Sequence, residues 1–192
     1  MHIVFYGPEG SGKGTQAKLL SEKLELPLVT FGDLVRESAQ NDKGELGDAA
    51  RIALTKGKYL PDDIAFALWK KRLKSNNTQK GWIIDGFPRS IKQAQFLEER
   101  ARAYGYKIDY FIYITLSDNE AVKRLARRQR KLFAGSTINH DDPIRVKNRL
   151  SEYRKKEKEI LSFFDKIGIL VKINGEQSIE DVHREIIQKI HA

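Results

Sequence analysis

Short runs of apolar, β-branched and aromatic residues alternate along the chain with longer segments in which hydrophobic positions recur at helical spacing. The apolar runs occupy residues 3–6, 28–31, 82–84, 110–116 and 169–173, and the helical patterns include residues 19–24, 61–69, 90–103, 118–131, 144–166 and 179–190. Continuous apolar strands separated by helices are typical of parallel sheets that are buried on both faces. The pattern therefore predicts an α/β fold in which helices cover both faces of a five-stranded parallel sheet.

The chain shows no internal repeat, low-complexity tract or long Pro/Gly linker, so we expect one domain over residues 1–192. Two stretches are predicted to be insertions into its core. Residues 32–61 are mostly helical in pattern, with turns at Gly44 and Gly57. Residues 129–141 have a weak helical period and contain Gly135-Ser136-Thr137, which predicts a mobile flap.

Composition narrows the class of protein. Hydrophobic residues make up 40% of the chain and charged residues 32%, as in a globular domain. No apolar run approaches the ~18 residues of a membrane span, and the N-terminus leads directly into a predicted strand, so we expect a cytoplasmic protein without membrane attachment. The chain has no cysteine, which excludes disulfides, thiolate catalysis and cysteine-ligated zinc.

The formal net charge of +9 raises the hypothesis of nucleic-acid binding. The charge is concentrated, because residues 121–160 hold 13 of the 35 basic side chains and only 5 of the 26 acidic ones. Such a segment predicts a concentrated anion as its ligand. A solvated basic helix that binds RNA is the alternative.

A glycine-rich loop follows the first predicted strand and precedes a helical pattern. It contains Gly7, Gly10, Gly12 and Gly14, and Lys13 stands directly before the last glycine. Glycines allow successive backbone N–H groups to point at one centre, and the N-terminus of the following helix favours an anion there. In this strand-to-helix context the loop predicts a phosphate site, with Lys13 on the terminal phosphates.

Residues 7–16, with the sequence GPEGSGKGTQ, resemble the phosphate loop of the adenylate kinase family of nucleoside monophosphate kinases, which typically reads GxPGxGKGTQ. The resemblance implies a P-loop NTPase core. It also implies an ATP site that comprises Gly10, Ser11, Gly12, Lys13, Gly14 and Thr15. Glu9 stands where the family has proline, and we expect its carboxylate to point to solvent and to reduce nucleotide affinity modestly.

Two further segments resemble the acceptor site of this family. Residues 30–36 are similar to its STGDLLR segment, and residues 85–89 match its DGFPR signature. The resemblance implies that Arg36 and Arg89 bind the phosphate of AMP and that Asp85 holds hydrated magnesium. It places Gly32 and Gly86 in the same site. Asp33 is in addition a good candidate for a helix N-cap.

Recognition of the acceptor base is implied by residues near these motifs. Gln93, four residues past Arg89, offers both a donor and an acceptor, and a glutamine here reads adenine in the family. Phe31 replaces a threonine near the base, where it would stack on the base or crowd it. Residues 57–62 resemble the GxLVPD segment, which implies that Leu54 and Leu60 line an apolar wall of the site. A core role for both leucines is an equal alternative.

The basic segment resembles the entry to the lid of the family. Its RLxxR pattern implies that Arg124 stacks on the donor adenine and that Arg128 contacts the phosphates. Residues 141–153 resemble the end of the lid, with Arg149 as the returning catalytic arginine. The arginine expected before the paired aspartates is absent. The candidate replacements are Arg127, Arg130 and Lys131. The flap is short, as in the short-lid type, and without cysteine it is not the zinc-bearing type.

The resemblance covers the whole chain and implies magnesium-dependent, reversible phosphoryl transfer from ATP to AMP by a cytoplasmic monomer, with no nucleic-acid partner. Lys13, Arg89, Arg128 and Arg149 are the expected catalytic residues. UMP, CMP or another nucleoside monophosphate could replace AMP as the acceptor. Two competing hypotheses are a basic RNA-binding protein without turnover and a kinase-like protein with impaired turnover.

Overall fold

The strands of this computed structural model form a five-stranded parallel sheet. The structure describes residues 1–56, 60–74, 78, 80–127 and 142–190. The strands are β1 (His2–Tyr6), β2 (Leu28–Thr30), β3 (Trp82–Asp85), β4 (Tyr110–Thr115) and β5 (Leu170–Asn174). Their order across the sheet is β2-β3-β1-β4-β5, and every neighbouring pair is parallel. The predicted sheet is confirmed.

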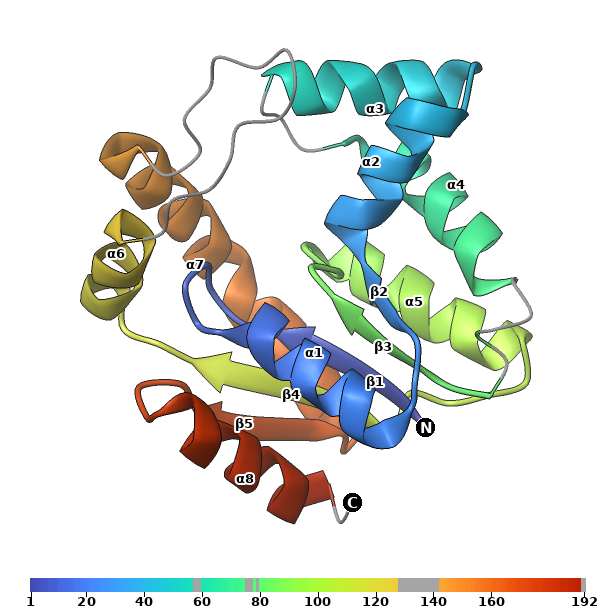
Figure 1. The fold of residues 1–192 in the computed structure, drawn as a ribbon. Coiled ribbons are helices and arrows are strands. Elements are labelled where there is room, and N and C mark those ends of the chain that lie inside the picture. The colour runs from blue at the N-terminus through green and yellow to red at the C-terminus, as the bar shows by residue number, and fades with distance from the viewer. Residues whose placement is uncertain (57–59, 75–77, 79, 128–141, 191–192) are drawn as a thin grey trace.

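Helices connect the strands and lie on both faces of the sheet (Figure 1). They are α1 (Lys13–Leu24), α2 (Phe31–Asn41), α3 (Glu45–Lys56), α4 (Asp62–Leu73), α5 (Ile91–Ala103), α6 (Asp118–Ala126), α7 (Pro143–Lys166) and α8 (Ile179–Ile190). In Figure 1, α1 and α8 lie in front of the sheet, α5 and α7 lie behind it, and α2, α3 and α4 are grouped together. Within the described ranges, no helix is long and apolar enough to cross a membrane.

Alternate residues of β1 explain why both faces are covered. Ile3 and Phe5 pack in one cluster with Leu20 of α1 and with residues of α8. Val4 belongs to the cluster on the opposite face, together with Phe164 of α7 and residues of α5. Because successive side chains of a strand point to opposite faces, a strand covered on both sides is apolar throughout. This is the continuous apolar pattern seen in the sequence.

The start of α2 differs from the sequence prediction. Phe31 is the first residue of the helix rather than the last residue of a strand, and the N-cap is Thr30, whose Oγ1 accepts a hydrogen bond from the Asp33 N–H at 3.1 Å. The prediction that Asp33 is the cap was wrong, since threonine and aspartate both cap well and the turn begins at Thr30. Partial burial acts to raise the pKa of Asp33, but hydrogen bonds from Thr30 and Arg36 hold it below its usual range.

The register of the strands brings their carboxyl ends to one edge of the sheet. Asp85 at the end of β3 pairs with Phe5 of β1 and with Thr30 of β2. On the other side of β1, Tyr6 pairs with Tyr113 of β4. The loops after β1 and β3 and the start of α2 after β2, which carry predicted site residues, therefore begin at the same edge. In open α/β sheets this is the edge where ligands bind.

His2 is buried at the opposite end of β1. Its ring stacks on that of Tyr106, with centroids 4.1 Å apart, and meets Trp82 edge-on. Burial lowers the pKa of His2 below its ordinary value of 6.5; the nearby N-terminal charge acts in the same direction, and Asp109 opposes it. The unfolded chain therefore binds a proton at His2 at a higher pH than the folded protein does.

We predict that His2→Phe reduces the loss of stability at acidic pH. As the pH falls below 6.5, proton uptake at His2 favours the unfolded state, so the free energy of unfolding of the wild type decreases. Phenylalanine keeps an aromatic ring in the stack and binds no proton. Urea unfolding at about pH 7.5 and about pH 5.5 should show a smaller decrease for the variant. His183, whose pKa is also lowered, is present in both proteins. An equal decrease in both would contradict the role of His2.

Candidate functional site

The glycine loop between β1 and α1 has the tightly curled backbone that its sequence predicts. Gly10 has a φ of +87°, a conformation that glycine adopts without steric cost. Gly7 is restricted by space as well, because a Cβ there would lie 2.5 Å from the carbonyl oxygen of Ile114. The Ser11 N–H donates to the Pro8 carbonyl at 3.2 Å and closes the turn. The loop is therefore built against the end of β4.

Lys13 begins α1 and reaches back over this loop. Its Nζ donates to the carbonyl oxygen of Pro8 at 3.2 Å. The N-cap of α1 is Gly12, which has no side chain to accept a hydrogen bond from the first turn. Gly14 and Thr15, in that first turn, are exposed. A helix N-terminus without a side-chain cap, with an adjacent lysine, has the chemistry of a phosphate site.

Asp85 lies beside the first turn of α1. Its Oδ2 is 3.2 Å from the position that a Cβ of Gly14 would take, and its Oδ1 is buried without a hydrogen-bond partner among the described residues. Mg²⁺ keeps several of its waters and takes one or two carboxylates together with phosphate oxygens. A carboxylate with one buried, unsatisfied oxygen next to a phosphate loop fits hydrated magnesium. In the described ranges, no group of three or more potential metal-binding side chains gathers.

The turn after β3 places Arg89 over the ring of Phe31. Arg89 Nε donates to the Gly86 carbonyl at 2.8 Å, and its guanidinium carbon lies 5.5 Å from the centroid of the Phe31 ring. Phe31 is 5% exposed and packs against Trp69 and Phe87. This aromatic ring is therefore part of the core, and it supports Arg89 through a cation–π contact.

Gln93, which lies in the first turn of α5, is buried, and its amide is held by two neighbours. Its Oε1 accepts a hydrogen bond from the Arg89 N–H at 2.7 Å, and its Nε2 donates to Oδ1 of Asp62 at 2.7 Å. These partners fix which end of the amide is oxygen and which is nitrogen, and leave one lone pair and one N–H for a ligand. The sequence had placed Asp62 in the GxLVPD-like segment and at the start of a helix, without a contact to Gln93.

The other residues predicted for the acceptor site lie in α2, in α3 and before α4. Arg36 is ion-paired with Asp33 on α2 and is about half exposed. Its guanidinium folds close to the backbone, since a Cβ at Gly32 would lie 3.2 Å from Arg36 Nη1. Leu60 belongs to the buried core, and Leu54 is half-buried and packs against the same cluster. Both leucines thus contribute to the core.

Arg124 extends from α6 toward the turn after β5. Its Nε pairs with Glu120 at 2.9 Å, and its Nη1 donates to the Gly175 carbonyl at 2.9 Å. Gly175 in turn lies against the phosphate loop, because a Cβ there would be 3.3 Å from the carbonyl oxygen of Ser11. Arg124 is therefore held near the phosphate loop on the β4 side of β1, whereas Asp85 is on the β3 side.

Arg149 reaches the phosphate loop from α7 and forms an ion pair with Glu9. Its Nε lies 3.0 Å from both carboxylate oxygens of Glu9, and its Nη2 donates to Oε2 at 2.7 Å. The arginine and glutamate side chains are only 20% and 33% exposed. The expectation that Glu9 points to solvent was wrong, because a guanidinium from a distant part of the chain covers the loop at this point.

The flap predictions lie outside the described residues. This applies to Arg128, to residues 129–141 as a whole and to the candidate replacements Arg130 and Lys131. Arg127, directly after α6, is described and exposed. The assignments made for the flap stay predictions.

Residues 5–169 match the family described as adenylate kinase. The chain belongs to the adenylate kinase family. The adenylate kinase of Prochlorococcus marinus is 38% identical over 180 residues, which cover 94% of this chain and 91% of the relative. That of Thermobifida fusca is 35% identical over 182 residues (95% and 94%), and that of Archaeoglobus fulgidus is 33% identical over 209 residues (97% and 96%). The family resemblance of the sequence motifs is confirmed.

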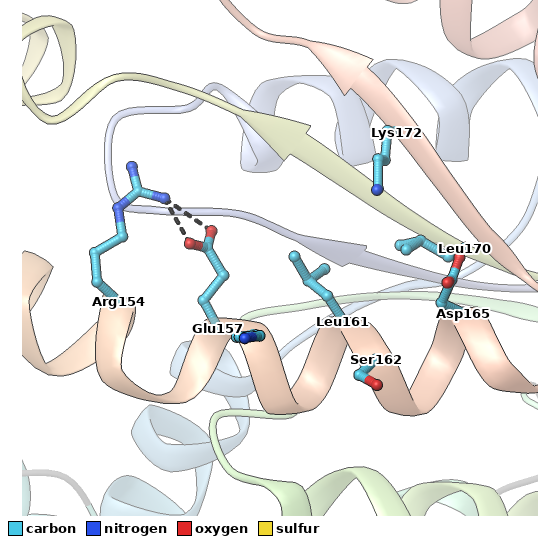
Figure 2. Close-up of a pocket in the computed structure, with 8 residues that line it drawn as sticks. Arg154, Glu157, Leu161, Ser162, Asp165, Leu170 and Lys172 are labelled. Atoms are coloured by element: carbon cyan, nitrogen blue, oxygen red, sulfur yellow. Dashed lines mark hydrogen bonds and ion pairs between the residues drawn. The ribbon is translucent and has the colours of Figure 1, made fainter.

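In this member of the adenylate kinase family, a pocket of about 360 Å³ lies between α7 and β5 (Figure 2). It is lined by Arg154, Glu157, Lys158, Leu161, Ser162, Asp165, Leu170 and Lys172. This lining contains none of the residues that the adenylate kinase motifs assign to a nucleotide. We therefore assign no part of the nucleotide site to this pocket.

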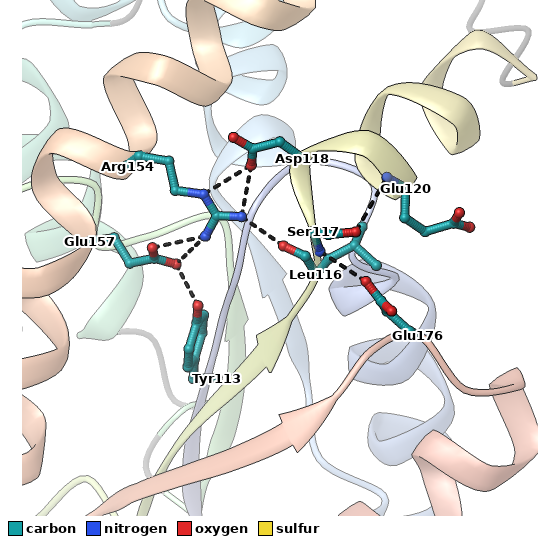
Figure 3. A network of polar contacts seen from close by, with 8 residues as sticks. All are labelled: Tyr113, Leu116, Ser117, Asp118, Glu120, Arg154, Glu157 and Glu176. Atoms are coloured by element: carbon teal, nitrogen blue, oxygen red, sulfur yellow. Dashed lines mark hydrogen bonds and ion pairs between the residues drawn. The ribbon is translucent and has the colours of Figure 1, made fainter.

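A polar network that the sequence did not predict joins α7 to the end of β4 and the start of α6 (Figure 3). Arg154 donates to Asp118 at 2.8 Å, to Glu157 at 2.8 Å and to the Leu116 carbonyl at 2.6 Å. The hydroxyl of Tyr113 donates to Glu157 at 2.5 Å. Burial, together with the adjacent Glu157 carboxylate, raises the pKa of Tyr113 to about 12.

The same network connects two helices that carry predicted site residues. It ties together α6 and α7, the helices that carry Arg124 and Arg149 toward the phosphate loop. Arg154 and Glu157 are three residues apart on α7, a spacing at which an ion pair could have been predicted. The contact with Asp118 has no such local signal, because it depends on how two helices pack.

Proposed function

We propose that this enzyme transfers a phosphoryl group reversibly from ATP to AMP and gives two molecules of ADP. One observation carries the proposal: the 85–89 turn begins beside the phosphate loop, with Asp85 Oδ2 only 3.2 Å from the Cβ position of Gly14. A loop suited to a triphosphate and a turn with a cation suited to a monophosphate thus follow neighbouring strands. Membership of the adenylate kinase family supports the same reaction.

The donor nucleotide is proposed to bind across the phosphate loop. The loop contributes Gly10, Ser11, Gly12, Lys13, Gly14 and Thr15, whose backbone N–H groups and lysine would surround the phosphates. Arg124, held near the loop by Gly175, would stack on the adenine, and Arg128 would contact the phosphates. Asp85 would hold magnesium through water, and the bound ion neutralises charge on the phosphate oxygens.

The acceptor AMP is proposed to bind against the helical insertion at residues 32–61. Arg36 and Arg89 would pair with its phosphate through charge-assisted hydrogen bonds. Gln93 would read the adenine edge with the lone pair and N–H that Arg89 and Asp62 leave available. The remaining contacts are assigned to Phe31, Gly32, Leu54, Leu60, Gly86 and Arg149.

This reaction needs no nucleophile from the protein. Its rate depends on holding the two nucleotides in line and on neutralising the charge of the moving phosphoryl group. Lys13, Arg89, Arg128 and Arg149 are proposed to supply that positive charge, and closure of the flap at residues 129–141 is proposed to exclude water. We further propose that the protein is a monomer, since the groups for both nucleotides come from one chain. We also propose that it acts in the cytoplasm.

Arg89→Ala is expected to lower kcat by about 10²–10³-fold while the protein stays folded, because it removes a cation from the transferring phosphoryl group. Lys13→Met should act in the same way. ADP formation from ATP and AMP, measured in a coupled assay, gives the rate, and circular dichroism reports on folding.

The matched control is Arg102→Ala, which removes an exposed arginine of α5 that pairs with Glu98. This control should keep the wild-type rate. A folded Arg89→Ala enzyme with near-full kcat would refute the proposed role of the 85–89 turn.

Gln93→Leu is expected to lower kcat/KM for AMP by about 10–100-fold, because leucine offers no hydrogen bond to the base. The wild type should prefer AMP to GMP, UMP and CMP in a panel of acceptors with ATP, and the variant should lose most of that preference. Gln95→Leu, at an exposed position of the same helix, is the control. A wild type without preference for AMP, or a variant that loses activity equally with every acceptor, would show that Gln93 does not read the base.

A further inference from the structure

The ion pair between Glu9 and Arg149 is a tertiary contact at the phosphate loop. Its hydrogen bonds of 2.7–3.0 Å join residues that are 140 positions apart. The guanidinium presents Nε and Nη2 to the carboxylate, the fork arrangement by which arginine also binds a phosphate. The pair between Lys155 and Glu152 on α7, by contrast, lies within one helical turn and is exposed.

The ion pair places a carboxylate at the loop that is proposed to bind the phosphates of ATP, so the carboxylate repels that ligand. Lys13 and the N-terminus of α1 favour an anion in the loop, whereas Glu9 adds a negative charge to the loop itself. Arg149 compensates this charge as long as it stays paired. A phosphate that takes the same edge of the guanidinium must therefore displace the carboxylate of Glu9.

We propose that Glu9 is an internal counter-ion that holds Arg149 before nucleotide binds and competes with the nucleotide phosphates for it. The inference rests on the proposed function, because it takes Arg149 as one of the cations that neutralise the moving phosphoryl group, which before transfer is the terminal phosphate of ATP. Arg149 can bind phosphate only in molecules in which its ion pair with Glu9 is broken. The smaller the fraction of such molecules, the higher the apparent dissociation constant for the nucleotide. Glu9 acts through Arg149 and is a positioning residue.

Glu9→Gln tests the competition, since glutamine keeps the size of the side chain and removes its charge. We expect the dissociation constant for Mg·ATP, measured by calorimetry without acceptor, to fall by about fivefold or more. Glu9→Ala, which removes the carboxylate altogether, should change it in the same direction. An unchanged or weaker affinity in both variants would overturn the proposal.

The melting temperature supplies a second readout, in which the loss of the ion pair is unfavourable although it improves nucleotide affinity. Without nucleotide, Glu9→Gln should melt at a lower temperature than the wild type, because the loop loses its ion pair with α7. The rise in melting temperature on adding Mg·ATP should be larger in the variant. If the pair had only a structural role, melting would be lowered while the affinity for Mg·ATP stayed unchanged, a result that would also overturn the proposal.

A matched control separates the pair from the net charge. Glu152→Gln removes one negative charge from an exposed position on α7, three residues after Arg149, and should leave the Mg·ATP affinity unchanged. A gain as large as that of Glu9→Gln would attribute the effect to overall charge and contradict the proposal. ADP formation by the wild type is measured in parallel: its absence would refute the proposed function, whereas turnover with unchanged affinity in the Glu9 variants would refute only the competition.

Discussion

The parallel register of β1 with its two neighbours is the constraint on which the rest of the structure depends. Phe5 is aligned with Asp85 of β3, and Tyr6 is aligned with Tyr113 of β4. The phosphate loop, the 85–89 turn and the segment that leads into α6 therefore leave the sheet at one edge. A slip by one residue would exchange the two buried faces of a strand, and Ile3 would then face the cluster that now holds Val4. The packing on both faces thus fixes the geometry of the site.

Near that edge of the sheet, several of the basic side chains that produce the positive net charge are paired with carboxylates. The sequence of the basic segment, residues 121–160, suggested a set of unpaired cations that would bind an anion. In the described residues, Arg124 is paired with Glu120, Arg154 with Asp118 and Glu157, and Arg149 with a glutamate of the loop itself. Capture of phosphate at Arg149 is consequently an exchange of one anion for another. The free energy of binding phosphate at Arg149 therefore depends on the ion pair with Glu9 that is broken, as well as on the contact with the ligand that is formed.

Local patterns in the sequence predicted the sheet, most helices and the phosphate loop, because each depends on residues that are close together. Gly10, for example, stands where the backbone needs a positive φ. The prediction from the sequence put the cap of α2 at Asp33, whereas Thr30 caps the helix; threonine and aspartate both cap well, so residue type alone does not decide between them. It could not predict the pair between Glu9 and Arg149, whose residues are 140 positions apart. The roles assigned to the site residues stay predictions.

The most direct test of the central claim, transfer between two nucleotides held at one sheet edge, is phosphorus NMR of the wild-type protein with magnesium, ATP and AMP. The account predicts that two ADP form for each ATP consumed, that no inorganic phosphate appears, and that the same mixture is reached from ADP alone. Release of one inorganic phosphate for each ATP, with AMP unchanged, would show hydrolysis instead of transfer. That result, or spectra that do not change, would contradict the account.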